Sequence, residues 1–374
     1  MKKNLIIFGT RPEAIKMAPL VKEFLKNSDI FETKVCITAQ HREMLDQVLS
    51  FFEITPDYDL DLMKPNQNLY SLTADIITNL KPILEEFKPD YVYVHGDTTT
   101  TMAASIAAFY SGAKVCHIEA GLRTFNKQSP FPEEVNRSIA GVIADYHFSP
   151  TPTSRQNLLN ENINKTTILV TGNTVIDALQ FSAAKVTSEV YLDSEIESLK
   201  KIVDSNKKLV LVTGHRRENH GQGFINICSA LKDIALQNTD VQIIYPVHLN
   251  PNVQKPVYEL LEGIDNIQLI NPLAYPGFVW LMGKSYLIIT DSGGVQEEAP
   301  SLGKPVLVMR ETTERPEAVE AGTVSLVGTD KNKIITEANR LLNNAAAYSE
   351  MSTLHNPYGD GTSCKKIVEF ISKL

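Results

Sequence analysis

The sequence predicts an α/β protein that contains two parallel sheets with helices on both faces. Apolar segments of about five residues, rich in Val, Ile, Leu and Tyr, alternate with amphipathic segments of helical length. Strands that are apolar throughout and separated by helices are typical of parallel sheets buried on both sides. The alternation occurs twice, and a polar, helical stretch between about Gly172 and Asp204 separates the two series. We therefore expect two domains, each with its own sheet.

The first series begins at the N-terminus. Its strands are expected at Leu5–Phe8, Lys34–Thr38, Tyr91–His95 and Lys114–Ile118, and short elements follow at Pro150–Asn160 and Ile168–Gly172. Pro12 suits the first turn of a helix that runs to about Lys26, and four threonines after Asp97 open another. Further helices are expected up to about Phe52, over Asn68–Phe87 and from Glu133 onward.

The second series repeats this rhythm. Its strands are expected at Leu209–Thr213, Val241–Tyr245, Ile267–Ile270, Tyr286–Thr290 and Pro305–Met309, and a last helix at Gly361–Lys373. The predicted organisation is a first domain over 1–172, a second over 173–360 and a closing helical segment over 361–374. Because ligands of open α/β sheets bind beyond the carboxyl ends of the strands, we expect the site in a cleft between these two domains.

Composition excludes several classes of protein. A net charge of −8 and a pI near 5.6 argue against nucleic acid or an anionic membrane surface as the main partner. The sequence contains no apolar run long enough to insert into a membrane, and its N-terminal apolar stretch is too short for a signal peptide. Four widely spaced cysteines predict reduced thiols and a cytoplasmic location.

Missing motifs narrow the chemistry further. The first strand is not followed by a GxGxxG pattern, and the sequence has no GxxxxGK[ST]. A nicotinamide redox site and a P-loop are therefore not expected. Five of the eight histidines end or follow predicted strands, but no HxH or HExxH pair occurs, so we predict no metal and no other cofactor.

The turn at Ser292, Gly293 and Gly294 joins an apolar strand to a helix. Two adjacent glycines allow the backbone to approach a ligand closely, and the first helical N–H groups point into the gap. This arrangement suits a phosphate or diphosphate, although a plain tight turn has the same local pattern. Glu297 and Glu298 are typical of a first helical turn, but one of them is also suited to bind a ribose diol.

Arginines concentrate where strands end. Of the ten arginines, seven lie in turns after strands or at the following helix starts, namely Arg11, Arg123, Arg137, Arg216, Arg217, Arg310 and Arg315. Guanidinium groups gathered at such positions in an acidic protein indicate a bidentate anion ligand. The structural alternative is that they cap and brace loops.

Several side chains could perform acid–base chemistry. Asp97 opens a helix, so it is either an N-cap or an acid–base group. Glu119 follows a buried strand with no helix nearby to cap, which favours function. Glu133 follows Pro132 at a helix start, and Arg137, one turn later, could simply be its ion-pair partner. His215 lies between Gly214 and two arginines, a setting that is not typical of a core histidine and that favours a functional role.

Six motifs together resemble one family. They are Gly9-Thr10-Arg11-Pro12-Glu13-Ala14-Ile15-Lys16, His95-Gly96-Asp97-Thr98-Thr99-Thr100, Glu119-Ala120-Gly121-Leu122-Arg123, Pro132-Glu133-Glu134 with Asn136-Arg137, Gly214-His215-Arg216-Arg217-Glu218-Asn219, and Asp291-Ser292-Gly293-Gly294-Val295-Gln296-Glu297-Glu298. In this order and spacing they resemble the bacterial non-hydrolysing UDP-N-acetylglucosamine 2-epimerases. The resemblance implies a GT-B fold of two Rossmann-like domains, a homodimer, and a last helix that packs on the first domain.

The resemblance also implies an activity and its residues. The family interconverts UDP-N-acetylglucosamine and UDP-N-acetylmannosamine by expelling UDP to a 2-acetamidoglucal and adding it back, and its products supply cell-envelope or capsular polysaccharide. The positions that match its catalytic residues are Asp97, Glu119, Glu133, Arg137 and His215. Those that match its substrate-binding residues are Arg11, Lys16, Leu273, Phe278, Ser292, Gly293, Gly294, Glu298 and Arg315.

Bacterial members are typically activated by substrate at a second site, and Gln40 and His41 match part of it. Glu43 and Asn66 stand where some members carry Gln and Arg. A carboxylate close to a second diphosphate would weaken its binding, so activation here is an open question.

Three alternatives share parts of this pattern. A GT-B glycosyltransferase uses the same fold and donor, so fold alone cannot separate it from an epimerase. A hydrolysing epimerase would release the free sugar. A sugar-nucleotide sensor would bind without turnover, which the intact acid–base positions argue against.

Overall fold

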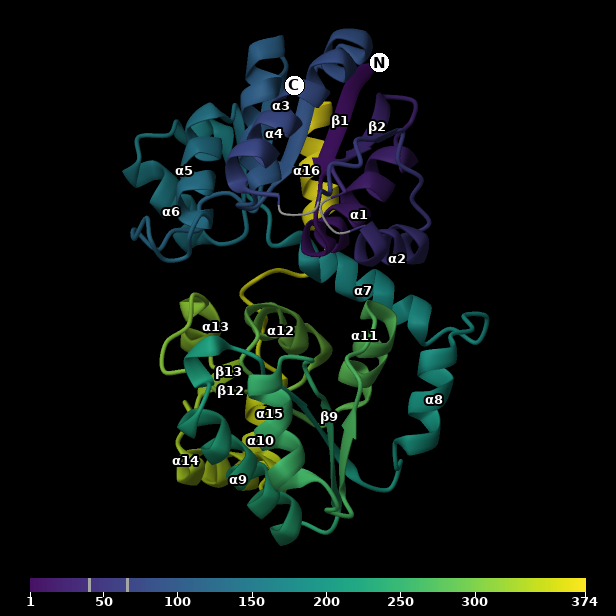
Figure 1. The fold of residues 1–374 in the computed structure, drawn as a ribbon. Coiled ribbons are helices and arrows are strands. Elements are labelled where there is room, and N and C mark those ends of the chain that lie inside the picture. Colours follow the sequence, from purple (N-terminus) through teal and green to yellow (C-terminus); the bar gives the residue numbers. More distant parts are fainter. Residues whose placement is uncertain (40–41, 65–66) are drawn as a thin grey trace. The chain divides into compact units, whose positions relative to one another are not determined.

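The computed structural model describes residues 1–39, 42–64 and 67–374, and it divides into two compact units (Figure 1). Unit 1 contains Met1–Ala178 and Tyr358–Leu374, and unit 2 contains Leu179–Pro357. The chain therefore passes between the units twice. The first passage lies within helix α7 (Thr174–Val186).

Unit 1 is built on a sheet of seven parallel strands in the order β3-β2-β1-β4-β5-β6-β7. The strands are β1 (Lys2–Phe8), β2 (Phe31–Ile37), β3 (Tyr58–Asp59), β4 (Tyr91–His95), β5 (Lys114–Ile118), β6 (Tyr146–Ser149) and β7 (Ile168–Val170). Strand order reverses between β1 and β4. The loops that follow these two strands therefore flank a switch point, where open α/β sheets bind ligands.

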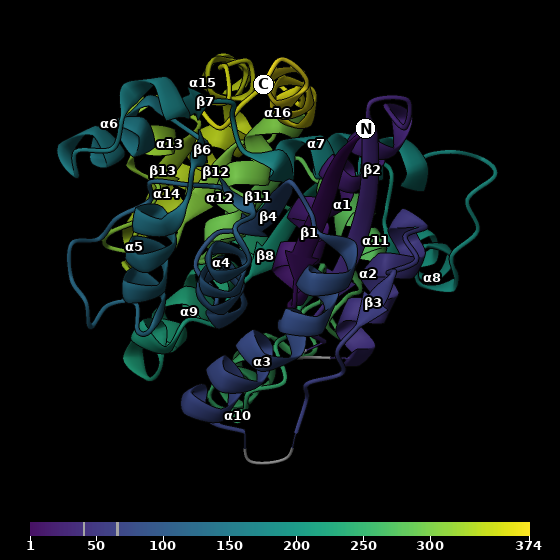
Figure 2. The same ribbon diagram turned by 90° about the horizontal axis from the view of Figure 1, so that it is seen from above.

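Helices cover both faces of this sheet. They are α1 (Arg11–Lys26), α2 (Arg42–Phe52), α3 (Leu69–Phe87), α4 (Thr99–Ser111), α5 (Glu133–Ile143), α6 (Pro152–Asn160), the 3-10 turn η1 (Lys165–Thr167) and the first part of α7. Helix α4 lies between α3 and α5 in both ribbon views (Figures 1 and 2). Alternate residues of β1 divide between the faces, and Leu5 and Ile7 pack in the core beneath α3 and α4.

The last helix, α16 (Ser363–Ser372), belongs to unit 1 and packs against α1. Figure 1 shows this yellow helix beside the purple β1. Lys2 Nζ donates to the carbonyl oxygens of Ile371 and Ser372 at 2.8 and 3.1 Å. At its other end, the Asp177 carboxylate accepts the backbone N–H groups of Ser363 and Cys364.

Unit 2 contains six parallel strands in the order β10-β9-β8-β11-β12-β13. They are β8 (Lys208–Thr213), β9 (Val241–Pro246), β10 (Ile267–Ile270), β11 (Leu287–Thr290), β12 (Val306–Val308) and β13 (Val324–Leu326). The order reverses between β8 and β11. The Thr213 and Thr290 hydroxyls, 2.6 Å apart, join the ends of these two strands.

The helices of unit 2 are the second part of α7, α8 (Ser194–Ile202), η2 (Arg217–Asn219), α9 (Gln222–Gln237), α10 (Pro251–Leu261), α11 (Tyr275–Lys284), α12 (Gly293–Glu298), η3 (Ala299–Leu302), α13 (Pro316–Glu320), α14 (Lys331–Asn343) and α15 (Ala345–Ser352). Helices α9, α10 and α14 contribute to one core cluster with Val210, Ile243 and Leu307 of the sheet. All of these side chains are fully buried, so this face of the sheet is closed to solvent.

The predicted fold class is confirmed, because both sheets are parallel and covered by helices. Three strands were not predicted: β3, β6 and β13. Their two to four residues are too few for an apolar run to be distinguished from a loop. Within the described residues no helix is long and apolar enough to cross a membrane. The four cysteines, all described, are buried and free.

Candidate active site

Three of the predicted site segments lie at neighbouring strand ends of unit 1. Gly9–Arg11 follow β1, Gly96–Asp97 follow β4 and Glu119 follows β5. Since β1, β4 and β5 are adjacent, the switch-point topology brings these segments to one edge of the sheet.

Glu13 joins the first two of these loops. Its Oε2 accepts the backbone N–H groups of Gly9 and Thr10 at 3.0 and 2.8 Å, which closes a capping box at the start of α1. Its Oε1 accepts the Thr98 hydroxyl at 2.6 Å from the loop after β4. Burial raises the pKa of Glu13, against the effect of these donors. The side chain therefore fixes the two loops that flank the switch point.

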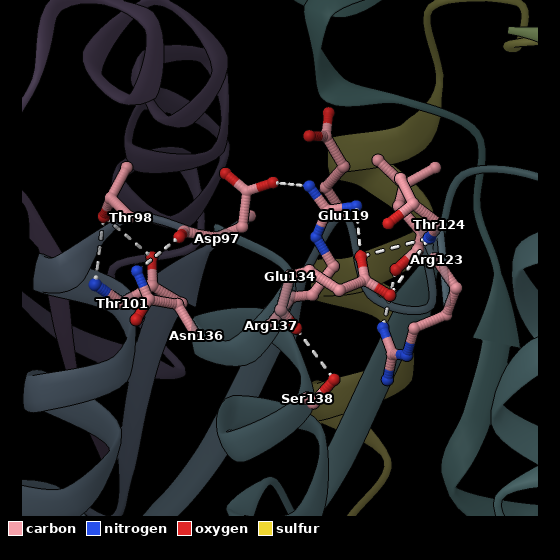
Figure 3. Close-up of polar contacts among 12 residues, drawn as sticks. Asp97, Thr98, Thr101, Glu119, Arg123, Thr124, Glu134, Asn136, Arg137 and Ser138 are labelled. Carbon is pink, nitrogen blue, oxygen red and sulfur yellow. Dashed lines mark hydrogen bonds and ion pairs between the residues drawn. The ribbon is translucent and has the colours of Figure 1, made fainter. Parts of the chain in front are cut away.

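Asp97 contacts Arg137 rather than capping a helix (Figure 3). The N-cap of α4 is the next residue, Thr98, whose hydroxyl accepts the N–H of Thr101 at 3.1 Å. Arg137 Nη2 donates to Asp97 Oδ2, and Asn136 Nδ2 donates to the Asp97 carbonyl at 3.0 Å. Asp97 is thus held from α5 through both its side chain and its backbone.

Within α5, Arg137 forms its ion pair with Glu134 and not with Glu133. The alternative in which Arg137 serves only as the ion-pair partner of Glu133 is therefore wrong. Arg137 Nη1 lies 3.3 Å from Glu134 Oε2. Glu134 is only 3% exposed and accepts the backbone N–H groups of Thr124 and Phe125 (Figure 3). It therefore anchors the loop before α5 and positions Arg137 at the same time.

Glu133, the first residue of α5, has one buried carboxylate oxygen, Oε2, without a hydrogen-bond partner in the described structure. A buried carboxylate oxygen normally accepts a hydrogen bond. The two adjacent glutamates therefore differ, since the Glu134 carboxylate has protein partners and Oε2 of Glu133 has none in the described structure.

Glu119 occupies the centre of a polar cluster. Its carboxylate contacts Lys16 Nζ, accepts Asn173 Nδ2 at 2.7 Å and lies 3.7 Å from His95 Nε2. Its backbone is in the left-handed region, at φ +61°, and its side chain is 8% exposed. Burial lowers the pKa of His95 to about 4, so this imidazole is neutral beside the Lys16–Glu119 pair.

In unit 2, the buried carboxylate of Asp291 organises the loop after β8. Asp291 Oδ2 accepts the backbone N–H groups of His215 and Arg216 at 2.9 and 2.8 Å. Its Oδ1 lies 3.5 Å from Nδ1 of the half-exposed His215 ring, which stacks on His248. Burial lowers the pKa of His215, His248 and Arg216 lower it further, and Asp291 raises it.

The turn at Ser292–Gly294 opens α12 with Ser292 at the N-cap position. A Cβ placed on Gly293 would lie 3.7 Å from Arg315 Cζ and 3.8 Å from Arg216 Nη2. Two guanidinium groups therefore flank this glycine, as a diphosphate site requires. Arg315 Nε also donates to the buried Glu297 at 2.5 Å.

Glu298 and the two residues expected near a base also belong to unit 2. Glu298 is the last residue of α12, and its Oε2 lies 3.7 Å from the Cβ position of Gly294. Leu273 lies between β10 and α11, and the half-buried Phe278 lies on α11. Glu195, on α8, accepts the N–H of Ala274 at the start of α11, so this segment is fixed from outside the site.

Two of the arginines that were predicted to bind an anion pair with carboxylates instead. Arg123 donates twice to Glu161 at 2.7 and 2.8 Å, and Arg310 pairs with Glu218 and Glu314. These two brace loops, as the structural alternative expected. Gln40, His41 and Asn66 lie outside the described residues, while Glu43 is exposed in the first turn of α2.

Comparisons with known proteins assign this chain to a family. Residues 23–372 match a family model described as UDP-N-acetylglucosamine 2-epimerase. A curated UDP-N-acetylglucosamine 2-epimerase from Escherichia coli K12 is 61% identical over 98% of this chain and 97% of its own. The chain belongs to the UDP-N-acetylglucosamine 2-epimerase family. A curated relative from Campylobacter jejuni is 58% identical over 100% of this chain and 98% of its own.

A solved member of the epimerase family has the same GT-B fold. The Neisseria meningitidis UDP-GlcNAc 2-epimerase, solved with UDP-GlcNAc bound, matches with a TM-score of 0.90 and 53% identity over the whole of both chains. Within this family fold, three positioning residues were missed: Glu13, Asn173 and Asp291. Glu13 had a readable signal, the Thr-x-x-Glu pattern of a capping box, and Asp291 directly follows a buried strand. Asn173 has no comparable signal.

Among residues 1–39, 42–64 and 67–374, no group of three His, Cys, Asp or Glu side chains is arranged to hold a metal ion. In this epimerase-family chain, the polar side chains at the strand ends pair instead with one another and with backbone groups.

Proposed function

We propose that this protein reversibly epimerises UDP-N-acetylglucosamine at C2 to UDP-N-acetylmannosamine, without releasing the free sugar. Family membership supports the activity, and UDP-GlcNAc is the ligand named for the Neisseria neighbour. The observation that carries the proposal is a pair of carboxylate–cation contacts, Asp97 with Arg137 and Glu119 with Lys16, at adjacent strand ends.

The chemistry of the substrate explains why such pairs are needed. The C2 hydrogen of the sugar has no adjacent carbonyl, so its direct removal is very difficult. In the proposed route a carboxylate takes the C2 proton, the C2–H electrons form a C1=C2 bond, and the C1–O bond electrons leave with UDP. UDP then adds back to C1 of the 2-acetamidoglucal while an acid delivers a proton to the opposite face of C2. Paired acid–base groups and a diphosphate clamp lower both barriers.

Two carboxylates are needed for these proton transfers. We assign one to Asp97 and the other to Glu119 or Glu133. Arg137 holds the Asp97 carboxylate in place, because it donates directly to that carboxylate. The buried free oxygen of Glu133 suits a group that meets the substrate. We assign the binding of the sugar and the diphosphate to Arg11, Lys16 and His215.

Unit 2 is proposed to hold UDP, and unit 1 the sugar and the acid–base groups. Ser292, Gly293 and Gly294 would hold phosphate between the Arg216 and Arg315 guanidinium groups. Glu298, at the end of α12, is assigned to the ribose hydroxyls. Phe278 and the backbone near Leu273 are assigned to uracil.

The setting of the reaction is also proposed. We infer a cytoplasmic homodimer that supplies N-acetylmannosamine units for cell-envelope or capsular polysaccharide. We also propose that a second substrate molecule binds where Gln40 and His41 match the family's activating site, and steady-state kinetics test this site. Substrate dependence that is sigmoidal, and that becomes hyperbolic when Gln40 and His41 are replaced by alanine, would support activation. Hyperbolic dependence in the unaltered protein would contradict it.

The decisive experiment is proton NMR of the protein with UDP-N-acetylglucosamine in D₂O, without added nicotinamide or metal. The proposal expects a growing UDP-N-acetylmannosamine signal, with deuterium entering at C2. Release of UDP and free sugar would indicate hydrolysis, and an unchanged spectrum would favour a glycosyltransferase that lacks its acceptor.

Variants connect the activity to the site. Asp97→Asn and Glu119→Gln should abolish turnover and deuterium incorporation but retain UDP binding in calorimetry. Glu350→Gln, at an exposed position of α15, is the matched control and should behave as the unaltered protein. Full turnover in either site variant would refute the corresponding assignment.

A further inference from the structure

Asn173 makes a direct contact with the Glu119 carboxylate. It is 2% exposed, lies between β7 and α7, and its Nδ2 donates to Glu119 Oε2 at 2.7 Å. The charged and titratable groups that face the same carboxylate are Lys16 of α1 and His95 of β4. Three elements therefore converge on this carboxylate.

The orientation of the Asn173 amide is fixed by the rest of its hydrogen bonds. Its Oδ1 accepts the Val175 N–H at 3.0 Å in the turn that begins α7. Nδ2 must then face Glu119, because the two ends of the amide cannot exchange without losing both bonds. The Asn173 backbone N–H donates to the Tyr358 carbonyl at 2.7 Å, so the residue is also held from the returning chain.

Close backbone packing reinforces this arrangement. Gly172 and Gly359 have φ values of +90° and +126°, and a Cβ on Gly172 would lie 3.2 Å from Gly359 Cα. Both segments are parts of unit 1 next to its two chain passages, since the division falls after Ala178 and before Tyr358. Asn173, which contacts Glu119, thus lies where the segment at Gly172 packs closely against the distant segment at Tyr358 and Gly359.

We propose that Asn173 is a positioning residue for the proposed epimerisation: its amide fixes Oε2 of Glu119, and the junction with Tyr358 and Gly359 fixes the amide. This inference rests on the proposed function, and of the two glutamates named there it takes Glu119 as the one that transfers a proton. A donor aimed at one carboxylate oxygen favours the ionised form and fixes the orientation of the whole carboxylate group. Oε1 lies on the side of Gly96, 3.6 Å from that glycine's Cβ position.

Asn173→Asp tests the contact with minimal change of shape. The aspartate retains an oxygen for the Val175 N–H but places an acceptor against Glu119 in place of the donor. We expect kcat to fall about 10- to 100-fold, as for loss of a hydrogen bond to a charged group, with little change in KM. The acid limb of the kcat–pH profile should move to higher pH, because a second carboxylate disfavours ionisation of Glu119.

Asn173→Ser is the second variant, in case the aspartate folds poorly. Its hydroxyl can still accept the Val175 N–H, but it is too short to reach Glu119. It should show the same loss of kcat with a smaller displacement of the acid limb. Asn27→Ala is the matched control, because Asn27 also donates from Nδ2, to the Glu23 carbonyl at 2.9 Å, but at the far end of α1.

In the double variant Asn173→Asp with Glu119→Gln, the hydrogen bond runs in the opposite direction, because the amide at position 119 donates to the carboxylate at position 173. It should recover thermal stability relative to Asn173→Asp but not turnover. The inference is overturned if the Asn173 variants keep the kcat and pH profile of the unaltered protein, or if they lose kcat only in proportion to stability and without movement of the acid limb. These results differ from failure of the proposed function, in which the unaltered protein would not epimerise UDP-N-acetylglucosamine.

Discussion

Asp291 holds both the backbone and the ring of His215. One carboxylate oxygen accepts the His215 N–H at 2.9 Å, while the other lies 3.5 Å from Nδ1 of its imidazole. The Asp291 side chain is fully buried, whereas the His215 side chain is 44% exposed. A buried negative charge thus supports a histidine that reaches solvent.

Asp291→Asn should lower the pKa of His215. The asparagine can still accept the backbone N–H groups, but it removes the negative charge that favours the imidazolium. The His215 resonance, followed by NMR between about pH 5 and 8, should titrate at a lower pH than in the unaltered protein. An unchanged or higher midpoint for His215 would show that the carboxylate has no such influence.

Glu134→Gln and Glu133→Gln should have opposite consequences. Glu134 is buried and accepts backbone N–H groups as well as Arg137, so its neutralisation should reduce the free energy of unfolding by about 1.5 to 3 kcal/mol. Glu133→Gln should leave unfolding within about 0.5 kcal/mol of the unaltered protein and reduce turnover by about 100-fold or more. Urea unfolding and NMR turnover measure the two effects. Equal losses of stability in both variants would contradict this division of roles.

Gly293→Ala should separate ligand binding from folding. The nearest side-chain atom to the added Cβ is 3.7 Å away, so the alanine fits the fold. It would occupy the space between Arg216 and Arg315 that we assign to phosphate. UDP affinity in calorimetry should fall by at least about tenfold, or about 1.4 kcal/mol, with an unchanged melting temperature.

The control for this glycine is Gly283→Ala. Gly283 is exposed on α11 with nothing within 4 Å of its Cβ position. Alanine there should keep UDP affinity and stabilise the helix by about 0.5 to 1 kcal/mol. Tight UDP binding by Gly293→Ala would place the diphosphate elsewhere.

Acid should destabilise unit 1 through its buried histidines. Burial lowers the pKa of His117 to about 3 and of His147 to about 4, and both are almost fully buried. Below about pH 6.5 these histidines bind protons in the unfolded chain but not in the folded protein. Their contribution to the free energy of unfolding is therefore fully present above that pH and decreases as the pH falls. Each such histidine contributes a slope of about 1.4 kcal/mol per pH unit between about pH 6 and 4.

His117→Gln isolates one of these contributions. The glutamine amide can donate to the Gly96 carbonyl, as His117 Nε2 does at 2.7 Å, but it does not titrate. Urea unfolding from about pH 7 to 4.5 gives the free energy of unfolding as a function of pH. Its slope should be shallower in His117→Gln, because about one proton fewer is taken up on unfolding than in the unaltered protein. His355→Gln, at an exposed position, should not change the slope. Identical slopes for His117→Gln and the unaltered protein would refute the prediction.

The regular strands were predictable because their signals are local. Tyr91–His95 and Lys114–Ile118 have the predicted bounds, since each is a short apolar run that ends at Gly96 or Glu119. Strand β13, Val324–Leu326, was not predicted because three residues carry no periodicity. Its position is decided by pairing with β12, which only the assembled sheet reveals.

The partners within the site could not be read from spacing. Arg137 and Asp97 are 40 residues apart, and the local pattern offered only an ion pair within the helix as the structural alternative. Likewise, Asn173 meets Glu119 across 54 residues, at a position with no distinctive sequence context. Sequence indicates which side chains follow strands, whereas the order of strands in the sheet decides which of them meet.

The placement of α16 has a consequence for the order of folding during synthesis. The ribosome completes unit 2, which is continuous from Leu179 to Pro357, before it makes the helix that packs on α1. Unit 1 begins first but cannot close around Lys2 and Asp177 until residues 363–372 have emerged. The nascent N-terminal half therefore waits with part of its apolar surface uncovered, and this half rather than the second is where a chaperone would be needed.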